Sequence, residues 1–167
     1  MSEYTRNLDH HFWEQDQRHA NCGSYALNVQ EWVYPDDEES LEDREDLMYN
    51  MWDATMDEDE TANALAERDW SAILRLFSFL RPVDTHTAAD PSKEVIAYRV
   101  GIAYNEEEDY LDEDFHFRVR RNGVWYEKCG TMRPHECFNQ DVEAEWTTPN
   151  GDLVYNSHTY YAVIEIE

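Results

Sequence analysis

The sequence has few cysteines and no long apolar run, and each of these shortages excludes a class of protein. Its 167 residues include three cysteines, Cys22, Cys129 and Cys137. A secreted domain with a disulfide framework usually has more cysteines and an even number of them. We therefore expect the protein to lie in a reducing cytoplasm. No run of about 18 apolar residues is present, which predicts no membrane span. The polar stretch 1–13 lacks the apolar core of a signal peptide.

Several motifs and linkers are also missing. A glycine-rich phosphate loop, HExxH and GxSxG are all absent, which excludes the usual nucleotide-binding, zincin and serine-hydrolase sites. No Gly/Ser/Pro-rich stretch is long enough to separate two domains. We therefore expect a single domain over 1–167, with a helical half at about 1–82 and an antiparallel-strand half at about 95–167.

Acidic side chains are abundant. The chain has 38 Asp and Glu against 13 Lys and Arg, a formal charge of −25, while 14% of its residues are aromatic, which opposes disorder. Such a field repels phosphate backbones and anionic lipids, so we expect neither direct nucleic-acid binding nor membrane binding. The acidity has three possible uses: solvation in a salt-adapted host, recognition of a basic protein or peptide partner, and mimicry of nucleic acid. Composition leaves all three open.

The first half has helical periodicity. A helix is expected to begin at Cys22, with Asn21 as its N-cap, and to end before Pro35. Two more are expected over 41–52 and from Thr61 to just before 82, capped by Ser40 and Thr61. Between residues 36 and 60 there are 13 acidic residues and one basic residue, Arg44. Their interleaving with apolar positions predicts helices with solvated outer faces.

The second half alternates with a period of two. Strands are expected at 95–104, 115–121 and 124–129, the last two joined by a tight Asn122-Gly123 turn. Residues 106–114 are expected to form a loop, and 153–155 and 159–166 a final pair of strands. Helices followed by antiparallel strands predict an α+β fold, with the N-terminal helices packed against the C-terminal sheet.

The Asn122-Gly123 turn fixes a register. With Arg121 opposite Val124, His116 falls opposite Cys129, and Glu127 is its diagonal neighbour on the same face. Trp125 shares that face. We therefore expect Glu127 to orient the His116 ring from one nitrogen, and Trp125 to shield the site.

Cys22 and His116 carry the chemistry of a candidate thiol site. A thiolate is favoured at a helix N-terminus, where free N–H groups and the helix dipole stabilise negative charge. Gly23 and Ser24 are small enough to let a substrate carbonyl approach backbone N–H groups. A histidine on a strand that faces the helix end would supply the base.

Two segments resemble known proteins. Residues 21–28, Asn-Cys-Gly-Ser-Tyr-Ala-Leu-Asn, are similar to the NCxxYALN segment of small, mostly uncharacterised bacterial and phage proteins. These proteins pair it with a D-[YF]-H-[FW]-x-R strand and then G-x-W. Here residues 114–120 read Asp-Phe-His-Phe-Arg-Val-Arg, and residues 123–125 read Gly-Val-Trp. A cysteine before small residues on a helix, with a strand histidine far downstream, resembles the papain-like peptidase superfamily.

The resemblance implies a papain-like cysteine hydrolase of peptide or other amide bonds, with Cys22 as nucleophile, His116 as general base and no cofactor. A glutamine donor to the oxyanion usually lies about six residues before the nucleophile. Position 16 is Asp, so Gln15 or Gln17 would serve. Asn139 or Asp141 could be a third catalytic residue. Aligning Cys22-Gly23-Ser24 with papain's CGSCW segment instead puts Tyr25 at the nucleophile position, which predicts an inactive relative.

Other interpretations stay open. Cys22 could be a small buried apolar residue, or Cys129 could be the reactive thiol. Zinc could bind Cys129 with the 135–137 segment, or Cys22 with the histidines at 10, 11 and 19, although neither has a structural-zinc spacing. The alternative function is a non-enzymatic acidic inhibitor, like small phage proteins, whose 36–60 and 106–114 faces block a basic surface of a partner.

Overall fold

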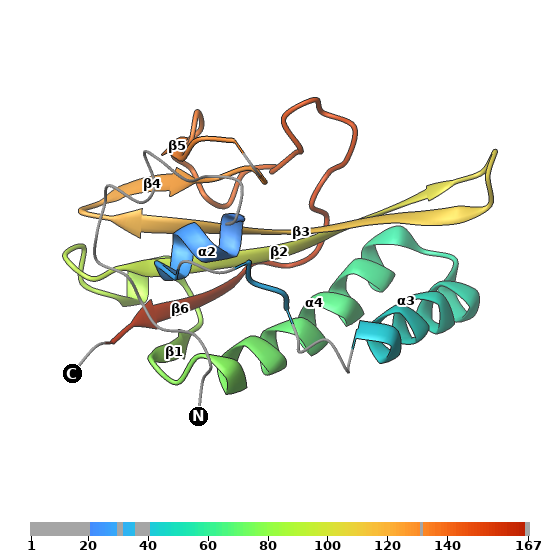
Figure 1. The fold of residues 1–167 in the computed structure, drawn as a ribbon, viewed down its shortest axis with the longest axis horizontal. Helices are drawn as coiled ribbons and strands as arrows, with labels where there is room; N and C mark the ends of the chain where they lie inside the picture. Colours follow the sequence, from blue (N-terminus) through green and yellow to red (C-terminus); the bar gives the residue numbers. More distant parts are fainter. Residues whose placement is uncertain (1–20, 30–31, 36–40, 131, 166–167) are drawn as a thin grey trace.

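The computed structural model describes residues 21–29, 32–35, 41–130 and 132–165. In these residues three helices precede an antiparallel sheet, so the expected α+β class is confirmed (Figure 1). The helices are α2 (Cys22–Leu27), α3 (Leu41–Thr55) and α4 (Glu58–Leu76). The strands are β1 (Leu80–Val83), β2 (Val95–Asn105), β3 (Tyr110–Arg121), β4 (Val124–Glu127), β5 (His135–Glu136) and β6 (Tyr160–Ile164), in the order β1-β6-β2-β3-β4-β5. None of the helices in the described ranges is long and apolar enough to cross a membrane.

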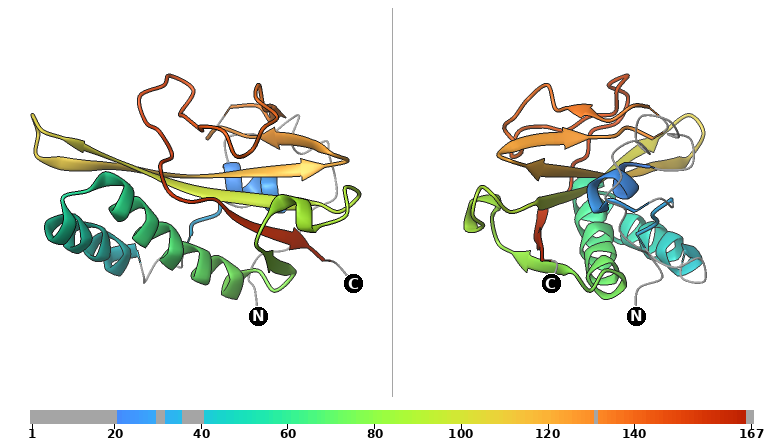
Figure 2. Two further views of the ribbon diagram at one scale, coloured as in Figure 1. Left: turned by 180° about the vertical axis from the view of Figure 1, so that it is seen from behind. Right: turned by 60° about the vertical axis from the view of Figure 1, so that its left-hand side comes forward.

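The two faces of the sheet are buried by different parts of the chain. Because side chains alternate along a strand, Tyr98 and Phe117 point to one face and the paired Arg99 and His116 to the other. The first face packs against α2 and α4 in the larger apolar cluster. The second packs against the segment that follows β5, which supplies Trp146 and other residues of the smaller cluster. Figure 2 shows α3 and α4 on one side of the sheet and this segment on the other.

The register expected for the β3–β4 hairpin is confirmed. Arg121 pairs with Val124 and Val119 with Tyr126. Asn122 and Gly123 both have positive φ, at 52° and 79°, as a type I′ turn requires. The turn therefore determines which residues of β4 lie beside His116.

The helix boundaries differ from the sequence prediction. Helix α3 runs on to Thr55, and α4 ends at Leu76 and not just before 82. Two further boundaries have a visible cause. Helix α2 ends at Leu27 and does not continue toward Pro35, because Asn28 adopts a left-handed conformation with φ 58° and closes the last turn. Helix α4 begins at Glu58, since the Asp57 side chain accepts from the Glu60 N–H at 3.0 Å. The Ser40 cap lies outside the described residues.

The sheet differs from the sequence prediction at four points. The strand expected at 124–129 ends at Glu127. Residues 110–114 belong to β3 and not to a loop, because they pair with the apolar end of β2. Pro82 lies inside β1, the first strand of the sheet, where a missing N–H is tolerated at the edge. Strand β6 pairs with β1 and β2, whereas Val154 makes only an isolated bridge to Thr147.

The one basic residue among the acids of 36–60 is buried. The Arg44 guanidinium on α3 forms hydrogen bonds to both carboxylate oxygens of Asp69 on α4, at 2.8 and 2.9 Å. Arg44 also contacts Glu113 on β3, and the Tyr98 hydroxyl donates to Asp69 at 2.7 Å. This network joins the acidic helices to the β2–β3 hairpin.

Candidate functional site

The first turn of α2 is fixed by Asn21, which forms the expected N-cap. Its side-chain oxygen accepts from the Ser24 N–H at 3.0 Å and from the Val33 N–H at 3.1 Å. Its amide nitrogen donates to the Val33 carbonyl at 2.6 Å. A Cβ on Gly23 would come within 3.0 Å of Phe117 and 2.9 Å of Val33. Only glycine lets α2 lie this close to β3, so Cys22 has little positional freedom.

Cys22 lies against the edge of β3, beyond the end of β4. Strand β4 pairs with β3 only over 119–121. Because backbone groups alternate between the two edges of a strand, the Phe115 carbonyl points to the same edge as β4. The Cys22 sulfur is 3.9 Å from that carbonyl oxygen. The start of α2 therefore occupies the edge that β4 leaves, next to the position of His116.

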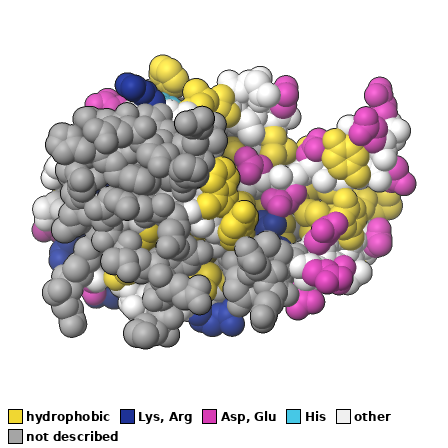
Figure 3. All heavy atoms as spheres, viewed as in Figure 1, with side chains coloured by type: hydrophobic (Ala, Val, Ile, Leu, Met, Phe, Trp, Pro, Cys, Tyr) yellow, Lys and Arg dark blue, Asp and Glu magenta, His cyan; other side chains and the backbone are white. Residues whose placement is uncertain are grey.

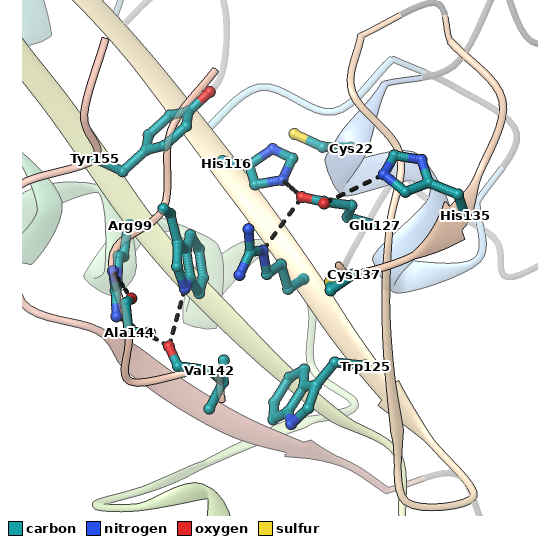
Figure 4. Close-up of polar contacts among 12 residues, drawn as sticks. Cys22, Arg99, His116, Trp125, Glu127, His135, Cys137, Val142, Ala144 and Tyr155 are labelled. Carbon is teal, nitrogen blue, oxygen red and sulfur yellow. Dashed lines mark hydrogen bonds and ion pairs between the residues drawn. The ribbon is translucent and has the colours of Figure 1, made fainter. Parts of the chain in front are cut away.

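His116 is held by Glu127, as the register predicts. Its Nε2 lies 2.7 Å from Oε1 of Glu127, and both residues are buried. In Figure 4, Cys22 projects beside the imidazole on the side away from the carboxylate. Cys22 and His116 line the same pocket of about 350 Å³. Sulfur, imidazole and carboxylate thus follow one another in the order that a thiol–base–orienting-acid site needs.

Glu127 has two further basic side chains beside it, Arg118 and His135. The Arg118 Nε lies 3.2 Å from the same Oε1, and the His135 Nε2 lies 3.3 Å from Oε2 (Figure 4). Burial by itself would raise the pKa of Glu127. The hydrogen bond and charge of His116, with the charges of Arg118 and His135, outweigh burial and lower that pKa to about 2. Glu127 is therefore an anion throughout the physiological range.

The aromatic rings beside His116 belong to Tyr155 and Trp146, and not to the predicted Trp125. Tyr155 stacks on the imidazole, with centroids 5.3 Å apart, and Trp146 meets it edge-on at 5.9 Å. Trp125, the expected shield, packs instead against His86. Both flanking rings come from the segment after β5, whose position over the sheet no strand periodicity indicates.

The electrostatic state of the thiol differs from the expectation. Burial raises the pKa of Cys22 to about 12, and the charge of Asp114 acts in the same direction. The six-residue α2 does not offset these effects. Cys129 also lines the pocket, and burial and the charge of Glu127 raise its pKa to about 12. Both thiols are therefore protonated in the resting protein at neutral pH.

Among the described residues, one group of side chains could hold a metal ion. Ligand atoms of His116, Glu127 and Cys129 lie within 4.8 Å of one another. The Arg118 guanidinium already supplies a positive charge to the central carboxylate, which disfavours a cation there. In the described part of the chain, the predicted combination of Cys129 with residues 135–137 forms no such group. The histidines at 10, 11 and 19 lie outside the described residues.

Of the remaining predicted residues, the structure describes Asn139 and Asp141. Gln15 and Gln17 lie outside the described residues, so the glutamine donor stays a prediction. Asn139 and Asp141 are exposed and hydrogen-bond within their own loop. His116 takes Glu127 as its partner instead.

Three residues of the site were not foreseen as functional: Asp114, Arg118 and Tyr155. Asp114 and Arg118 flank His116 at a spacing of two, so the strand periodicity could have placed them on its face. For Tyr155 no comparable signal exists.

The chain matches no protein-family model, no curated protein and no solved structure significantly. The resemblance to papain-like peptidases therefore stays an expectation drawn from two short sequence motifs.

Proposed function

We propose that this protein is a papain-like cysteine hydrolase that cleaves a peptide or related amide bond. The observation that carries the proposal is the 2.7 Å contact between His116 Nε2 and Glu127, beside Cys22 in one pocket. It leaves Nδ1 of His116 to receive the thiol proton. A buried structural cysteine would need neither this pocket nor an oriented imidazole.

Three residues of the pocket and its wall divide the steps of the reaction between them. His116 removes the Cys22 proton as the sulfur attacks the substrate carbonyl, and the Cys22 N–H helps to hold the oxyanion, with Gln15 or Gln17 as the predicted second donor. His116 then protonates the leaving amine. Water, deprotonated by His116, adds to the acyl-cysteine and releases the acid and the free thiol. Glu127 fixes the ring and balances the charge that it gains.

The raised pKa of Cys22 determines how the thiol is activated. A preformed thiolate–imidazolium pair is disfavoured in this pocket, because burial and Asp114 both oppose the negative charge. The proton must therefore move as the substrate binds, as it does in serine hydrolases, where the nucleophile is neutral at rest.

Acylation by nitrophenyl acetate tests the proposal, because the ester can acetylate the active thiol and the nitrophenolate that leaves is coloured. Mass spectrometry should find the acetyl group on Cys22 in wild-type protein and in the Cys137→Ser control, but not in His116→Ala. If Cys129 alone is acetylated, or if His116→Ala reacts as fast as wild type, the assignment is wrong.

A second candidate function has support of its own. The acidic segments predicted to form an interaction face are brought together, because the Tyr104 N–H donates to Glu58 at 3.0 Å and Arg44 contacts Glu113. Figure 3 shows acidic side chains gathered at the end of the molecule formed by α3 and the tip of the β2–β3 hairpin. Such a surface fits a basic partner, and the protein could be an inhibitor that covers one.

Charge reversal separates this function from a general effect of net charge. The variant Glu106→Lys/Glu107→Lys/Glu108→Lys changes the exposed hairpin tip. Its control, Glu136→Lys/Glu143→Lys/Glu145→Lys, changes three exposed residues elsewhere by the same charge. Affinity for a lysine-rich peptide should fall much more in the first variant and should weaken with salt. Equal losses would argue against a dedicated face.

A further inference from the structure

Among the described residues that line the pocket beside Cys22, Asp114 alone carries a carboxylate. No Lys or Arg is among the described residues that line this pocket. No cationic nitrogen in the described ranges forms an ion pair with Asp114 either. Among the described residues, therefore, no cationic side chain neutralises the negative charge that an occupant of the pocket would meet.

The Asp114 carboxylate is fixed, but its hydrogen-bonding capacity is not exhausted. Its Oδ1 accepts from the Phe115 N–H at 2.9 Å and its Oδ2 from the Tyr155 hydroxyl at 2.6 Å. A carboxylate can accept about four hydrogen bonds. Two sites thus remain for donors of a ligand, and the two existing bonds hold the group in one orientation.

A glycine in β2 brings Tyr155 to Asp114. Gly101 pairs with Asp114 across the β2–β3 ladder. A Cβ at Gly101 would lie 2.6 Å from the Val154 carbonyl oxygen and 3.1 Å from the Tyr155 Cα. The segment that follows β5 therefore crosses the sheet directly over Gly101, and only glycine permits this approach. The crossing places a hydroxyl on Asp114 and the Tyr155 ring on the pocket wall.

Resting on the proposed function, we infer that the hydrolase selects acyl groups that carry a positive charge, and that Asp114 binds this charge. A protonated amine fits because it donates up to three hydrogen bonds and neutralises the carboxylate. The pocket also has aromatic rings from Tyr155 and Trp32, which attract cations through their faces. The substrate class is thus a peptide or amide with an ammonium or guanidinium group on the acyl side of the scissile bond.

Pairs of nitrophenyl esters that differ only in charge test this inference. The glycinate ester is compared with the acetate ester, which places the ammonium near the carbonyl. The aminohexanoate ester is compared with the hexanoate ester, which places it far from the carbonyl. In each reaction Cys22 gains the acyl group, nitrophenolate leaves, and His116 takes the thiol proton. We expect at least one ammonium ester to acylate Cys22 about tenfold faster than its neutral partner, corrected for their rates with free cysteine.

Asp114→Asn should abolish that preference, so that the ratio of the charged to the neutral ester rate falls to the ratio seen with free cysteine. Asp112→Asn is the matched control, because Asp112 is an exposed carboxylate on the same strand. If Asp114→Asn does not fold, the salt dependence of the wild-type preference for the charged ester tests the inference instead. A contact with a partly buried carboxylate resists screening by salt better than the field of the whole protein does.

The outcomes also separate this inference from the proposed function. Acylation of Cys22 at equal rates by charged and neutral esters would overturn the inference alone. A preference that persists in Asp114→Asn, or that salt removes completely, would come from the negative field of the whole protein. That result would also overturn the inference. Acylation of Cys22 by none of the esters would instead overturn the proposed function.

Discussion

Glu127 and His116 lie on adjacent strands of one hairpin, with 2.7 Å between Oε1 and Nε2, and both are buried. The Asn122-Gly123 turn produces this contact, because a shift of one residue in register would turn Glu127 to the opposite face. The orientation of the candidate base is therefore encoded in a turn several residues away from it.

Replacing Glu127 with Gln should destabilise the protein at neutral pH by about 1–3 kcal/mol, because a buried charge-assisted bond is lost. The folded state lowers the pKa of Glu127 from 4.5 to about 2. Its contribution is therefore present above pH 4.5 and is lost as the pH falls toward 2. Urea unfolding of the two proteins should converge over this range. Exposed Glu136→Gln is the control, and a gap that stays constant down to low pH would contradict the account.

Gly101→Ala should cost about 1–3 kcal/mol, because its Cβ would meet the backbone at Val154 and the chain would have to shift. Tyr155→Phe removes only the hydroxyl bond to Asp114 and should cost about 1 kcal/mol. Thermal unfolding measures both. If Gly101→Ala is as stable as wild type, the close crossing over β2 is wrong.

Removing Arg44 should be among the most damaging single changes. Arg44→Met leaves the fully buried Asp69 carboxylate without its guanidinium, at an expected cost of about 3–5 kcal/mol. Arg44→Met/Asp69→Leu removes both charges and should cost less than the single variant. Exposed Arg75→Ala should stay within about 0.5 kcal/mol of wild type. Additive losses in the double variant would show that the two side chains do not depend on each other.

Alkylation of the resting thiols should be slow at neutral pH. Burial raises the pKa of Cys22, Cys129 and Cys137 each to about 12, and only the thiolate reacts with iodoacetamide. The labelling rate at Cys22, followed by mass spectrometry, should therefore keep rising with pH. A fast plateau below neutrality would instead reveal a preformed ion pair with His116.

The sequence predicts the parts of the site that depend on local pattern. The cap at Asn21, the turn at Asn122-Gly123 and the register between His116 and Glu127 follow from rules that act over a few residues. The strand before His116 is harder to predict, because its acidic residues look like a solvated loop until β2 is placed beside them.

What sequence reasoning missed depends on tertiary contacts. Tyr155 reaches Asp114 because the chain crosses over Gly101, and a single glycine in an apolar strand does not reveal which segment crosses there. Helix α2 is shortened by Asn28, whose left-handed conformation the pattern of apolar residues does not show. The raised pKa of Cys22 likewise arises from burial among segments that are distant in sequence.

The most direct test of the central claim is the acylation rate of Cys22 by nitrophenyl acetate in wild type and in His116→Ala, at neutral and at high pH. If His116 is the base, the variant should be slower by about a hundredfold or more at neutral pH. The difference should shrink at high pH, where hydroxide ionises the thiol without help. Equal rates at neutral pH would contradict the claim and would make Cys22 a structural cysteine.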